Sequence, residues 1–395
     1  MASTGPEIHN WQQPSGAELS GLLDSPLHFT KVELRVLGLP QHESFRSAVG
    51  SRLQREALLV RLHGSDGLFG IAECSARPDP YYNAEFLEGC LAVLRSFAVP
   101  AMRSGMRLAE LQQALRRIRG WQFTTAAVLD AALDLLRRSG VPDLLDRWPG
   151  QRLSRIPAGI SLGIFDDAAS AERRVQQALA EGYRRIKLKC SPSQDHGVLR
   201  AAIAACADTE CALDANGSFS EDELELVLEL TEGVAMLEQP FAPDRLDLHA
   251  RLHAQRPGLR LCLDESVHHA GELESAIAML ALTELNLKPG RVGGQLNAVP
   301  LLQRCAAKGL GCWIGGMFES GVGRVANLRH AACLPQATAH DLGPSARYFE
   351  RDILREPVRM GSDGMIEPGS EAPVELDERA VEEMTMQLEY LEPGR

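Results

Sequence analysis

The feature of this chain that most constrains its fold is a regular alternation of short β-type runs with helical stretches, which begins near residue 155. Most of the intervening stretches are 12 to 18 residues long and rich in Ala, Leu, Glu and Arg, which is typical of helices. One of these helices is predicted to begin at an N-capping serine, Ser170, and to stop at Gly182. The eight predicted strands are Ile156–Ile164, Arg185–Lys189, Cys211–Leu213, Val234–Leu237, Leu259–Leu263, Glu284–Leu287, Gly311–Ile314 and Thr338–Asp341. This alternation predicts parallel βαβ units, and the even spacing favours a closed TIM-like (β/α)7β barrel over an open doubly wound sheet.

A different pattern precedes the barrel. Strand-like runs at Lys31–Leu37, Ala57–Leu62 and Gly67–Ala72 are followed by helical stretches near 83–97, 107–118 and 121–138. We therefore expect an α+β domain over residues 28–150 and the barrel over 151–350. Residues 1–27 are expected to form a poorly ordered extension, with a short packed helix as the alternative. The acidic segment 351–395 is expected to pack back on the N-terminal α+β domain.

Composition excludes several classes of function. Of 395 residues, 45% are apolar and 24% charged, which predicts a folded soluble protein. The net charge of −12 argues against sequence-independent binding to nucleic acid and against docking on an anionic membrane. No apolar run approaches the roughly 20 residues of a membrane helix, and the first 30 residues contain no Lys or Arg, so we expect a cytoplasmic protein. The nine cysteines contain no CxxC pair, which favours buried thiols over disulfides or a zinc site.

Charged residues follow five consecutive strands of the predicted barrel. They lie 24 to 26 residues apart, one βα unit after another, at Lys189, Asp214, Glu238, Asp264 and Lys288. Lys187 lies two residues before Lys189 on the same strand, so both side chains project to one face. The C-terminal ends of barrel strands form the catalytic face of this architecture. We therefore expect these five side chains to converge there.

Converging carboxylates need a cation, and an all-oxygen donor set suits Mg²⁺. A lysine near other cations has a lowered pKa and can act as a base near neutral pH. A carboxylate bound to Mg²⁺ becomes more acidic at its α-carbon, because the metal stabilises the enediolate. The set is therefore suited to removing a proton α to a carboxylate.

Each residue also has a purely structural interpretation. A single Asp at a strand end is usually a helix N-cap or a turn residue, and a Lys-x-Lys pair is usually a solvated edge. Five such groups in register with five successive strands favour the functional interpretation. For Glu265 and Lys187, direct chemistry and support of neighbouring groups both stay open.

With these residues, the sequence resembles the enolase superfamily and, within it, the o-succinylbenzoate synthase/N-succinylamino acid racemase family. The superfamily uses a Lys or His base with one or two Mg²⁺ ions. The resemblance runs from about Phe29 to Pro368. The motifs that carry it are Arg185–Lys189 (RIKLK), Leu213–Asn216 (LDAN), Glu238–Pro240 (EQP), Cys262–Ser266 (CLDES), Asn286–Gly294 (NLKPGRVGG) and Gly315–Asn327 (GGMFESGVGRVAN).

The resemblance implies roles for individual residues. Asp214, Glu238 and Asp264 would bind Mg²⁺, with Mn²⁺ as a substitute. Lys189 and Lys288 would be the acid/base pair, with Lys187 and Glu265 in support. The N-terminal α+β domain would cap the barrel, and its loops at Ser44–Gly50 and Pro78–Tyr82 would contact the distal part of the substrate. The implied substrate-binding residues are Phe45, Arg46, Ser161, Asn216, Arg291, Gly316, Met317 and Phe318.

The resemblance implies two related activities. The first is o-succinylbenzoate synthase, a dehydratase of menaquinone biosynthesis in which Lys189 removes the proton α to the substrate carboxylate before water is lost from the same face. The second is N-succinylamino acid racemase, in which Lys189 and Lys288 act on opposite faces, and one protein can have both activities. A third hypothesis, from another class, is an inactive scaffold that only binds ligands. We expect a small-molecule carboxylate substrate, no nucleic-acid or membrane partner, and a homo-oligomer.

Overall fold

The computed structural model describes residues 16–47, 50–148, 150–335, 337–368 and 373–394, without the side chains of residues 16–18, 43–47 and 50–53. Residues 1–15 of the predicted N-terminal extension lie outside this description. The described part of that extension contains a short helix, α1 (Gly16–Leu23). In the described ranges, no helix is both long enough and apolar enough to cross a membrane.

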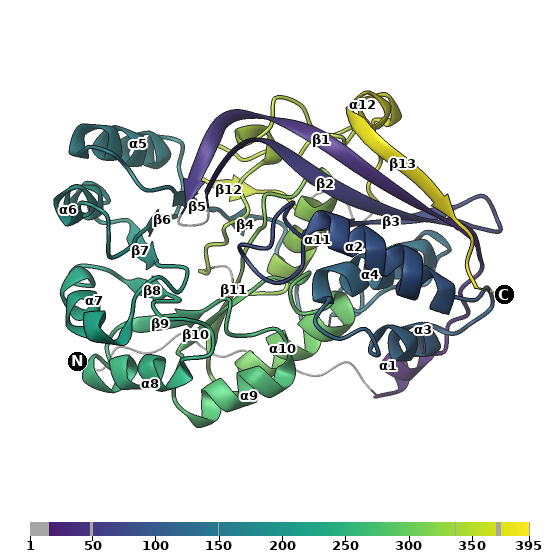
Figure 1. Cartoon of the computed structure of the whole chain (residues 1–395), viewed down its shortest axis with the longest axis horizontal. Coiled ribbons are helices and arrows are strands. Elements are labelled where there is room, and N and C mark those ends of the chain that lie inside the picture. The colour runs from purple at the N-terminus through teal and green to yellow at the C-terminus, as the bar shows by residue number, and fades with distance from the viewer. Residues whose placement is uncertain (1–15, 48–49, 149, 336, 369–372, 395) are drawn as a thin grey trace.

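A seven-stranded parallel sheet forms the larger part of the molecule, which confirms the predicted α/β class. Its strands follow one another in sequence order from one edge to the other. They are β5 (Gly159–Leu162), β6 (Arg185–Lys189), β7 (Glu210–Asp214), β8 (Met236–Glu238), β9 (Arg260–Leu263), β10 (Glu284–Leu287) and β11 (Gly311–Ile314). The sheet is curled, with helices along its outer side (Figure 1).

The predicted eighth strand, Thr338–Asp341, is not a regular strand. It makes a single parallel bridge, between Ala158 and His340, in which the Gly159 amide donates to the His340 carbonyl at 2.6 Å. In the turn before this segment, the Thr338 amide donates to the Pro335 carbonyl, and Pro344 follows the segment. Few of its residues are therefore free to pair with a neighbouring strand. On the β11 side, His340 Nδ1 accepts from the Ile314 amide at 3.0 Å. The described architecture is therefore a curled seven-stranded sheet, and the fully closed barrel stays a prediction.

Helices follow most strands of this sheet. They are α5 (Ala168–Ala180), α6 (His196–Ala205), α7 (Leu224–Leu230), α8 (Leu246–Gln255), α9 (Ala270–Ala278), α10 (Gln295–Ala307) and α11 (Gly321–Ala331). The predicted start of α5 at Ser170 is wrong. Asp167 is the N-cap, and its carboxylate accepts from the Ser170 amide at 2.8 Å. An aspartate competes well with a serine for this position, because its charge also interacts favourably with the helix dipole.

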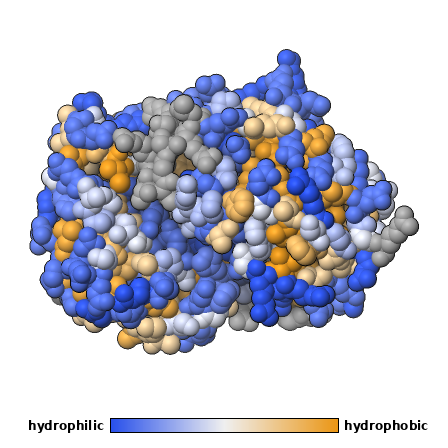
Figure 2. All heavy atoms as spheres, viewed as in Figure 1, coloured by the Kyte–Doolittle hydropathy of each residue, from blue (hydrophilic) through white to orange (hydrophobic). Residues whose placement is uncertain are grey.

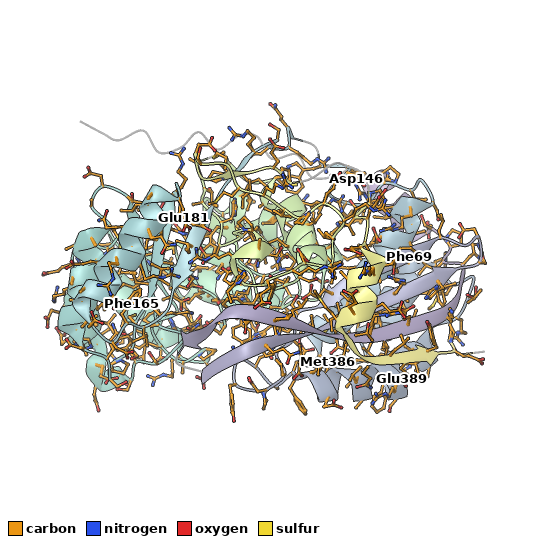
Figure 3. The ribbon with its side chains drawn as sticks, turned by 90° about the horizontal axis from the view of Figure 1, so that it is seen from above. Phe69, Asp146, Phe165, Glu181, Met386 and Glu389 are labelled. Atoms are coloured by element: carbon orange, nitrogen blue, oxygen red, sulfur yellow. The ribbon has the colours of Figure 1, made fainter. Side chains whose placement is uncertain are left out.

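A four-stranded antiparallel sheet forms the second part, in the order β13-β1-β2-β3. The strands are β1 (Phe29–Ser47), β2 (Gly50–Gly64), β3 (Phe69–Cys74) and β13 (Thr385–Leu391). The C-terminal strand β13 pairs with β1 from Val32 opposite Leu391 to Leu37 opposite Thr385. Figure 3 shows β13 at the sheet edge, where Met386 and Glu389 are labelled.

Four further α-helices of the described chain lie outside the parallel sheet and its connections. They are α2 (Leu87–Val93), α3 (Leu108–Leu115), α4 (Gln122–Arg138) and α12 (Glu378–Met384). A two-stranded pair of β4 (Ile156–Pro157) and β12 (Met365–Ile366) lies beside the start of the parallel sheet. Figure 2 shows hydrophobic residues gathered on the right of the view, where Figure 1 places α2 and the antiparallel sheet.

One continuous hydrophobic core runs through both sheets and their helices. A separate small cluster, Ala212, Met236, Cys262 and Trp313, lies on the strands β7, β8, β9 and β11 of the parallel sheet. All nine cysteines are free and buried, which confirms the prediction of buried thiols.

Candidate active site

The register of the parallel sheet brings the predicted catalytic residues together. Lys189 is the partner of Asp214 in the β6–β7 ladder, and Asp214 is the partner of Glu238 in the β7–β8 ladder. Asp264 and Lys288 come one residue after β9 and β10. All five lie at the C-terminal edge of the sheet because each strand is followed by its helix on the same side.

Lys187 is buried among three carboxylates. Its ammonium lies 2.6 Å from Glu238 Oε2, 2.7 Å from Asp341 Oδ2 and 3.1 Å from Asp214 Oδ2. Burial alone would lower the pKa of Lys187, but the charges of Asp341, Glu238 and Asp214 raise it well above its usual range. Lys187 is therefore held as an ammonium among these carboxylates.

Lys189 is more exposed than Lys187 and has fewer charged partners. Its Nζ donates to Asp214 Oδ2 at 2.7 Å and also to Asn216 Oδ1. Burial would raise the pKa of Asp214, but Lys189 and Lys187 together hold it below its usual value. Asp214 is therefore ionised and orients the amine of Lys189 toward the cavity that both residues line.

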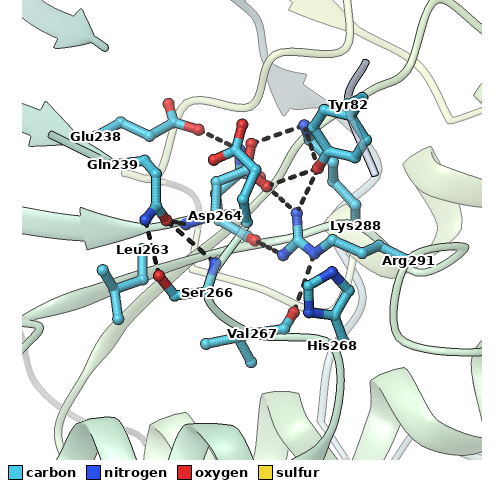
Figure 4. A network of polar contacts seen from close by, with 12 residues as sticks. Tyr82, Glu238, Gln239, Leu263, Asp264, Ser266, Val267, His268, Lys288 and Arg291 are labelled. Atoms are coloured by element: carbon cyan, nitrogen blue, oxygen red, sulfur yellow. Dashed lines mark hydrogen bonds and ion pairs between the residues drawn. The ribbon is translucent and has the colours of Figure 1, made fainter. Parts of the chain in front are cut away.

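Asp264 is the centre of a network on the opposite wall (Figure 4). Its Oδ2 accepts from Lys288 Nζ at 2.8 Å, and its Oδ1 contacts the guanidinium of the fully buried Arg291. The Tyr82 hydroxyl lies 3.2 Å from Asp264 Oδ1, from Lys288 Nζ and from Arg291 Nη1. The network fixes the Lys288 amine at the end of β10.

The pKa of Lys288 differs from the expectation drawn from sequence. Burial lowers it, but Tyr82, Glu265 and Glu238 outweigh burial, and the resulting pKa lies above the usual value. A lowered pKa, as the sequence suggested, would require the cations near Lys288 to outweigh the anions. Among the protein's own charges, the acidic groups around Lys288 dominate instead.

Glu265 interacts with Asn216 on one side of the site and with the charge of Lys288 on the other. Its Oε1 accepts from Asn216 Nδ2 at 2.8 Å, while its Oε2 is buried and has no hydrogen-bond partner. Burial raises the pKa of this carboxyl, and the charge of Lys288 only partly offsets the effect. An unsatisfied buried carboxylate oxygen is costly unless a cation or donor reaches it.

The acidic residues fit a divalent cation by their chemistry. Asp214, Glu238 and Asp264 offer only oxygen atoms at three neighbouring strand ends, which is the donor type that Mg²⁺ prefers. The partnerless Oε2 of Glu265 is a further buried acceptor beside them. Within the described ranges, no three His, Cys, Asp or Glu side chains are arranged to hold a metal as they stand. The reason is that each of the three carboxylates is turned toward a lysine or arginine of the protein.

These residues surround a cavity of about 140 Å³ between the two sheets. Of the residues and loops predicted from sequence, the cavity is lined by Pro78, Tyr82, Ser161, Lys187, Lys189, Asp214, Asn216, Lys288, Gly316, Met317 and Phe318. Glu238, Asp264, Glu265 and Arg291 are buried around it and do not line it. Phe45 and Arg46 pair with Arg52 and Ser51 through the backbone of β1 and β2, and their side chains lie outside the described part of the structure.

Sequence reasoning missed several residues that line the cavity. They are Gln41, Gln54, Arg55, Arg77, Asn286, Arg324, Asp341 and Tyr348. Asp341 could have been found, because it is the last residue of the eighth predicted strand and so belongs to the same edge as the other acids. The residues before position 80 carry no such spacing signal, because they reach the cavity only through the packing of the antiparallel sheet.

Backbone strain is concentrated at this site. Among the described residues other than glycine, five have a positive φ, and three of these are Asn216 (46°), Gln239 (41°) and Phe318 (60°). Each follows the C-terminal end of a strand of the parallel sheet. Such conformations persist only where the surrounding structure holds them, and they cluster at functional sites.

Comparisons with known proteins agree with this site. Residues 170–378 match the family described as "Enolase C-terminal domain-like". The chain is 34% identical to N-succinylamino acid racemase of Thermus thermophilus over 91% of this chain and 98% of that protein. It is 33% identical to o-succinylbenzoate synthase of Geobacillus kaustophilus over 90% of this chain and 95% of that protein.

A solved structure has the same overall fold. An enolase-superfamily member from Listeria innocua is 27% identical, with a TM-score of 0.85 over 93% of this chain and 99% of that chain. Superfamily members generally use Mg²⁺, in agreement with the donor set described above. The chain therefore belongs to the enolase superfamily and, within it, to the o-succinylbenzoate synthase/N-succinylamino acid racemase family.

Proposed function

We propose that this protein is an o-succinylbenzoate synthase of menaquinone biosynthesis, which removes a proton α to a carboxylate and then eliminates water. The observation that carries the proposal is the placement of two lysines, Lys189 and Lys288, at the C-terminal ends of β6 and β10, which three strands separate in one curled sheet, so that both line one cavity. The relatives named above support an enzyme of this kind.

The chain's own residues account for the proton transfers. Lys189 accepts the α-proton, because Asp214 and Asn216 direct its amine into the cavity. The protonated Lys189 then donates a proton to the departing hydroxyl on the same face of the substrate. Lys288, held as an ammonium by Asp264, stabilises the negative charge that develops on the substrate.

Asp214, Glu238 and Asp264 would hold Mg²⁺, with Mn²⁺ as a substitute. When bound, the cation would stabilise negative charge on the substrate carboxylate and make its α-proton more acidic. Lys187 and Asn286 hold Glu238 through contacts of 2.6 Å to its two oxygens. Both side chains therefore keep this carboxylate in the site.

N-succinylamino acid racemase activity is a second candidate. It is favoured by the same geometry, since two lysines on separate strands can deliver and remove a proton from opposite faces of one carbon. Relatives with either name align over most of this chain, so one protein with both activities is part of the proposal.

The first experiment measures both activities on one preparation. Proton exchange is followed by NMR in D₂O with Mg²⁺ and N-succinyl amino acids, beside dehydration of the cyclohexadiene carboxylate precursor. Dehydration without exchange supports a dedicated synthase, and exchange at comparable efficiency supports a bifunctional enzyme or racemase. If neither occurs, the substrate assignment is wrong.

The catalytic role of Lys189 is tested by Lys189→Ala. We expect loss of both activities by about 1,000-fold or more, because the proposed base on that face is removed. The matched control is Lys308→Ala, which removes an exposed lysine at the end of α10 and should leave turnover unchanged. Equal turnover of the two variants would show that Lys189 is not the base.

A further inference from the structure

The loop between β11 and α11 forms one wall of the cavity. Gly316, Met317 and Phe318 on this loop line the cavity, and Phe318 has a φ of 60°. The Phe318 ring packs edge-on against Tyr348 at 4.8 Å between ring centroids. A loop with a strained residue needs firm anchors at its ends to keep one shape.

Its C-terminal anchor comes from the antiparallel sheet. Glu73 on β3 reaches the N-terminus of α11, where its Oε2 accepts from the Ser320 amide at 3.0 Å and from the Ser320 hydroxyl at 2.6 Å. The same oxygen accepts from the Gly323 amide at 3.3 Å. Ser320 itself makes no side-chain cap to the helix. Two distant carboxylates cap α11 instead: Glu73, from 247 positions earlier, and Asp352, which accepts from the Gly321 amide at 2.8 Å.

A second carboxylate continues this anchor into the loop. Glu319 Oε1 accepts from the Met317 amide and from Asn327 Nδ2, both at 2.8 Å. A Cβ at Gly323 would lie 2.7 Å from the Glu319 Cβ and 3.1 Å from Glu73 Oε2. The helix start, Glu319 and Glu73 are therefore packed without spare room, and a shift at Glu73 is transmitted to the wall of the cavity.

We propose that Glu73 is a positioning residue, which holds the loop at Gly316, Met317 and Phe318 in its substrate-binding shape by capping α11 from the antiparallel sheet. The inference rests on the proposed function, because it takes this cavity as the substrate site. Glu73 does not line the cavity, so it acts on the substrate through residues that do, which are those of the loop and Arg55.

The charges around Glu73 make the cap sensitive to its ionisation. Burial and the nearby Glu319 raise the pKa of Glu73 to about 7, while the bonds from Ser320 and the charge of Arg55 lower it. Arg55 lies on β2 and lines the cavity, and its Nε is buried without a partner. Loss of the Glu73 charge therefore weakens the cap. It also removes a negative charge that interacts with the Arg55 guanidinium.

The test compares Glu73→Gln with a matched loss of a cap elsewhere. Glutamine keeps the shape of glutamate but removes the charge. The control is Asp377→Asn, because Asp377 caps α12 through the Ala380 amide at 3.1 Å and lies outside the cavity lining. We expect Glu73→Gln to raise KM about 10-fold with kcat within about 3-fold of wild type, since the lysines are untouched. Asp377→Asn should change neither constant.

Hydrogen exchange of the backbone amides separates this inference from the proposed function. Glu73→Gln should speed exchange at Ser320 and Gly323, whereas Asp377→Asn should not. Ser320→Ala removes the 2.6 Å hydrogen bond from the Ser320 hydroxyl to Glu73. It should also raise KM, and its effect should not add to that of Glu73→Gln. If wild type turns over neither substrate, the proposed function fails, and exchange alone decides whether Glu73 holds the loop. An unchanged KM for Glu73→Gln in an active enzyme overturns the inference, whatever the exchange rates.

Discussion

At the scale of single residues, the site depends on how each lysine is paired. Lys187 has three carboxylates around it, and Lys189 has one carboxylate and one amide. Lys288 shares Asp264 with Arg291 and also contacts the Tyr82 hydroxyl. Two lysines two positions apart on β6 both line the cavity but have different partners, because Lys187 lies among three carboxylates and Lys189 among one carboxylate and one amide.

Tyr82 provides a test of this pairing. We expect Tyr82→Phe to lower kcat about 10-fold, because it removes the hydroxyl that bridges Lys288, Arg291 and Asp264. The ring stays in place under Lys288, whose Nζ lies 4.7 Å from the ring centroid, so folding should not change. Steady-state kinetics of both reactions measure the effect. Tyr81→Phe is the control on the same loop, since the Tyr81 side chain is 68% exposed, and equal kinetics for the two variants would contradict the prediction.

At the scale of elements, two helices of the parallel sheet are held at their N-termini by the N-terminal part of the chain. Glu73 of β3 caps α11, and Asp130 of α4 accepts from the Gln295 amide at the start of α10 at 2.9 Å. These helices follow β11 and β10, whose ends carry the cavity loop and Lys288. The antiparallel sheet and its helices therefore fix both loops through buried carboxylates.

The cap at Asp130 predicts a dependence of stability on pH. Burial raises the pKa of Asp130 from 3.8 to about 7, with Asp143 raising it further and the Gln295 amide and Arg329 opposing. Between these values the folded protein binds more protons than the unfolded chain. The stability that Asp130 contributes is thus complete below pH 3.8 and is lost as the pH rises through about 7.

Between pH 4 and 8, we therefore expect the free energy of unfolding of wild type to fall by on the order of 4 kcal/mol more than that of Asp130→Asn. Urea unfolding at several pH values measures this difference. Asp167→Asn, which changes an exposed cap of α5, should show no such trend relative to wild type. A difference that does not vary with pH would show that Asp130 keeps its charge throughout.

At the scale of the whole molecule, the site lies between two sheets that meet over one hydrophobic core. The C-terminal strand β13 pairs with β1, so the chain returns to its beginning and completes the antiparallel sheet. Segments at both ends of the sequence thereby support the sheet from which Arg55 and Glu73 reach the site.

Metal binding should stabilise the whole molecule. We expect EDTA to abolish both activities and Mg²⁺ to restore them. We also expect Mg²⁺ at 100 times its Kd to add about 2.7 kcal/mol to the free energy of unfolding, which raises Tm by several degrees. Asp264→Asn should lose this rise, and Asp377→Asn should keep it. A Tm unaffected by Mg²⁺ in wild type would contradict the assignment of the three carboxylates.

The sequence by itself was sufficient for the parallel α/β fold and for the placement of charged residues at the strand ends. A strand followed by a helix repeats every 24 to 26 residues, so the order of the strands and the edge to which Lys189, Asp214 and Glu238 belong follow from local pattern. The helix start at Asp167 and the short eighth segment were not predictable in the same way, because competing caps and flanking turns decide them.

Only the tertiary structure decided which groups face one another. The pairing of Asp264 with Arg291 and Tyr82, the approach of Asp341 to Lys187 and the cap from Glu73 to α11 each join residues that no repeat in the sequence connects. The two sheets pack through a shared core, and packing is a property of shape and volume that local periodicity does not encode. The sequence therefore determined the reactive groups and their edge of the sheet, and the packing of the sheets determined their partners.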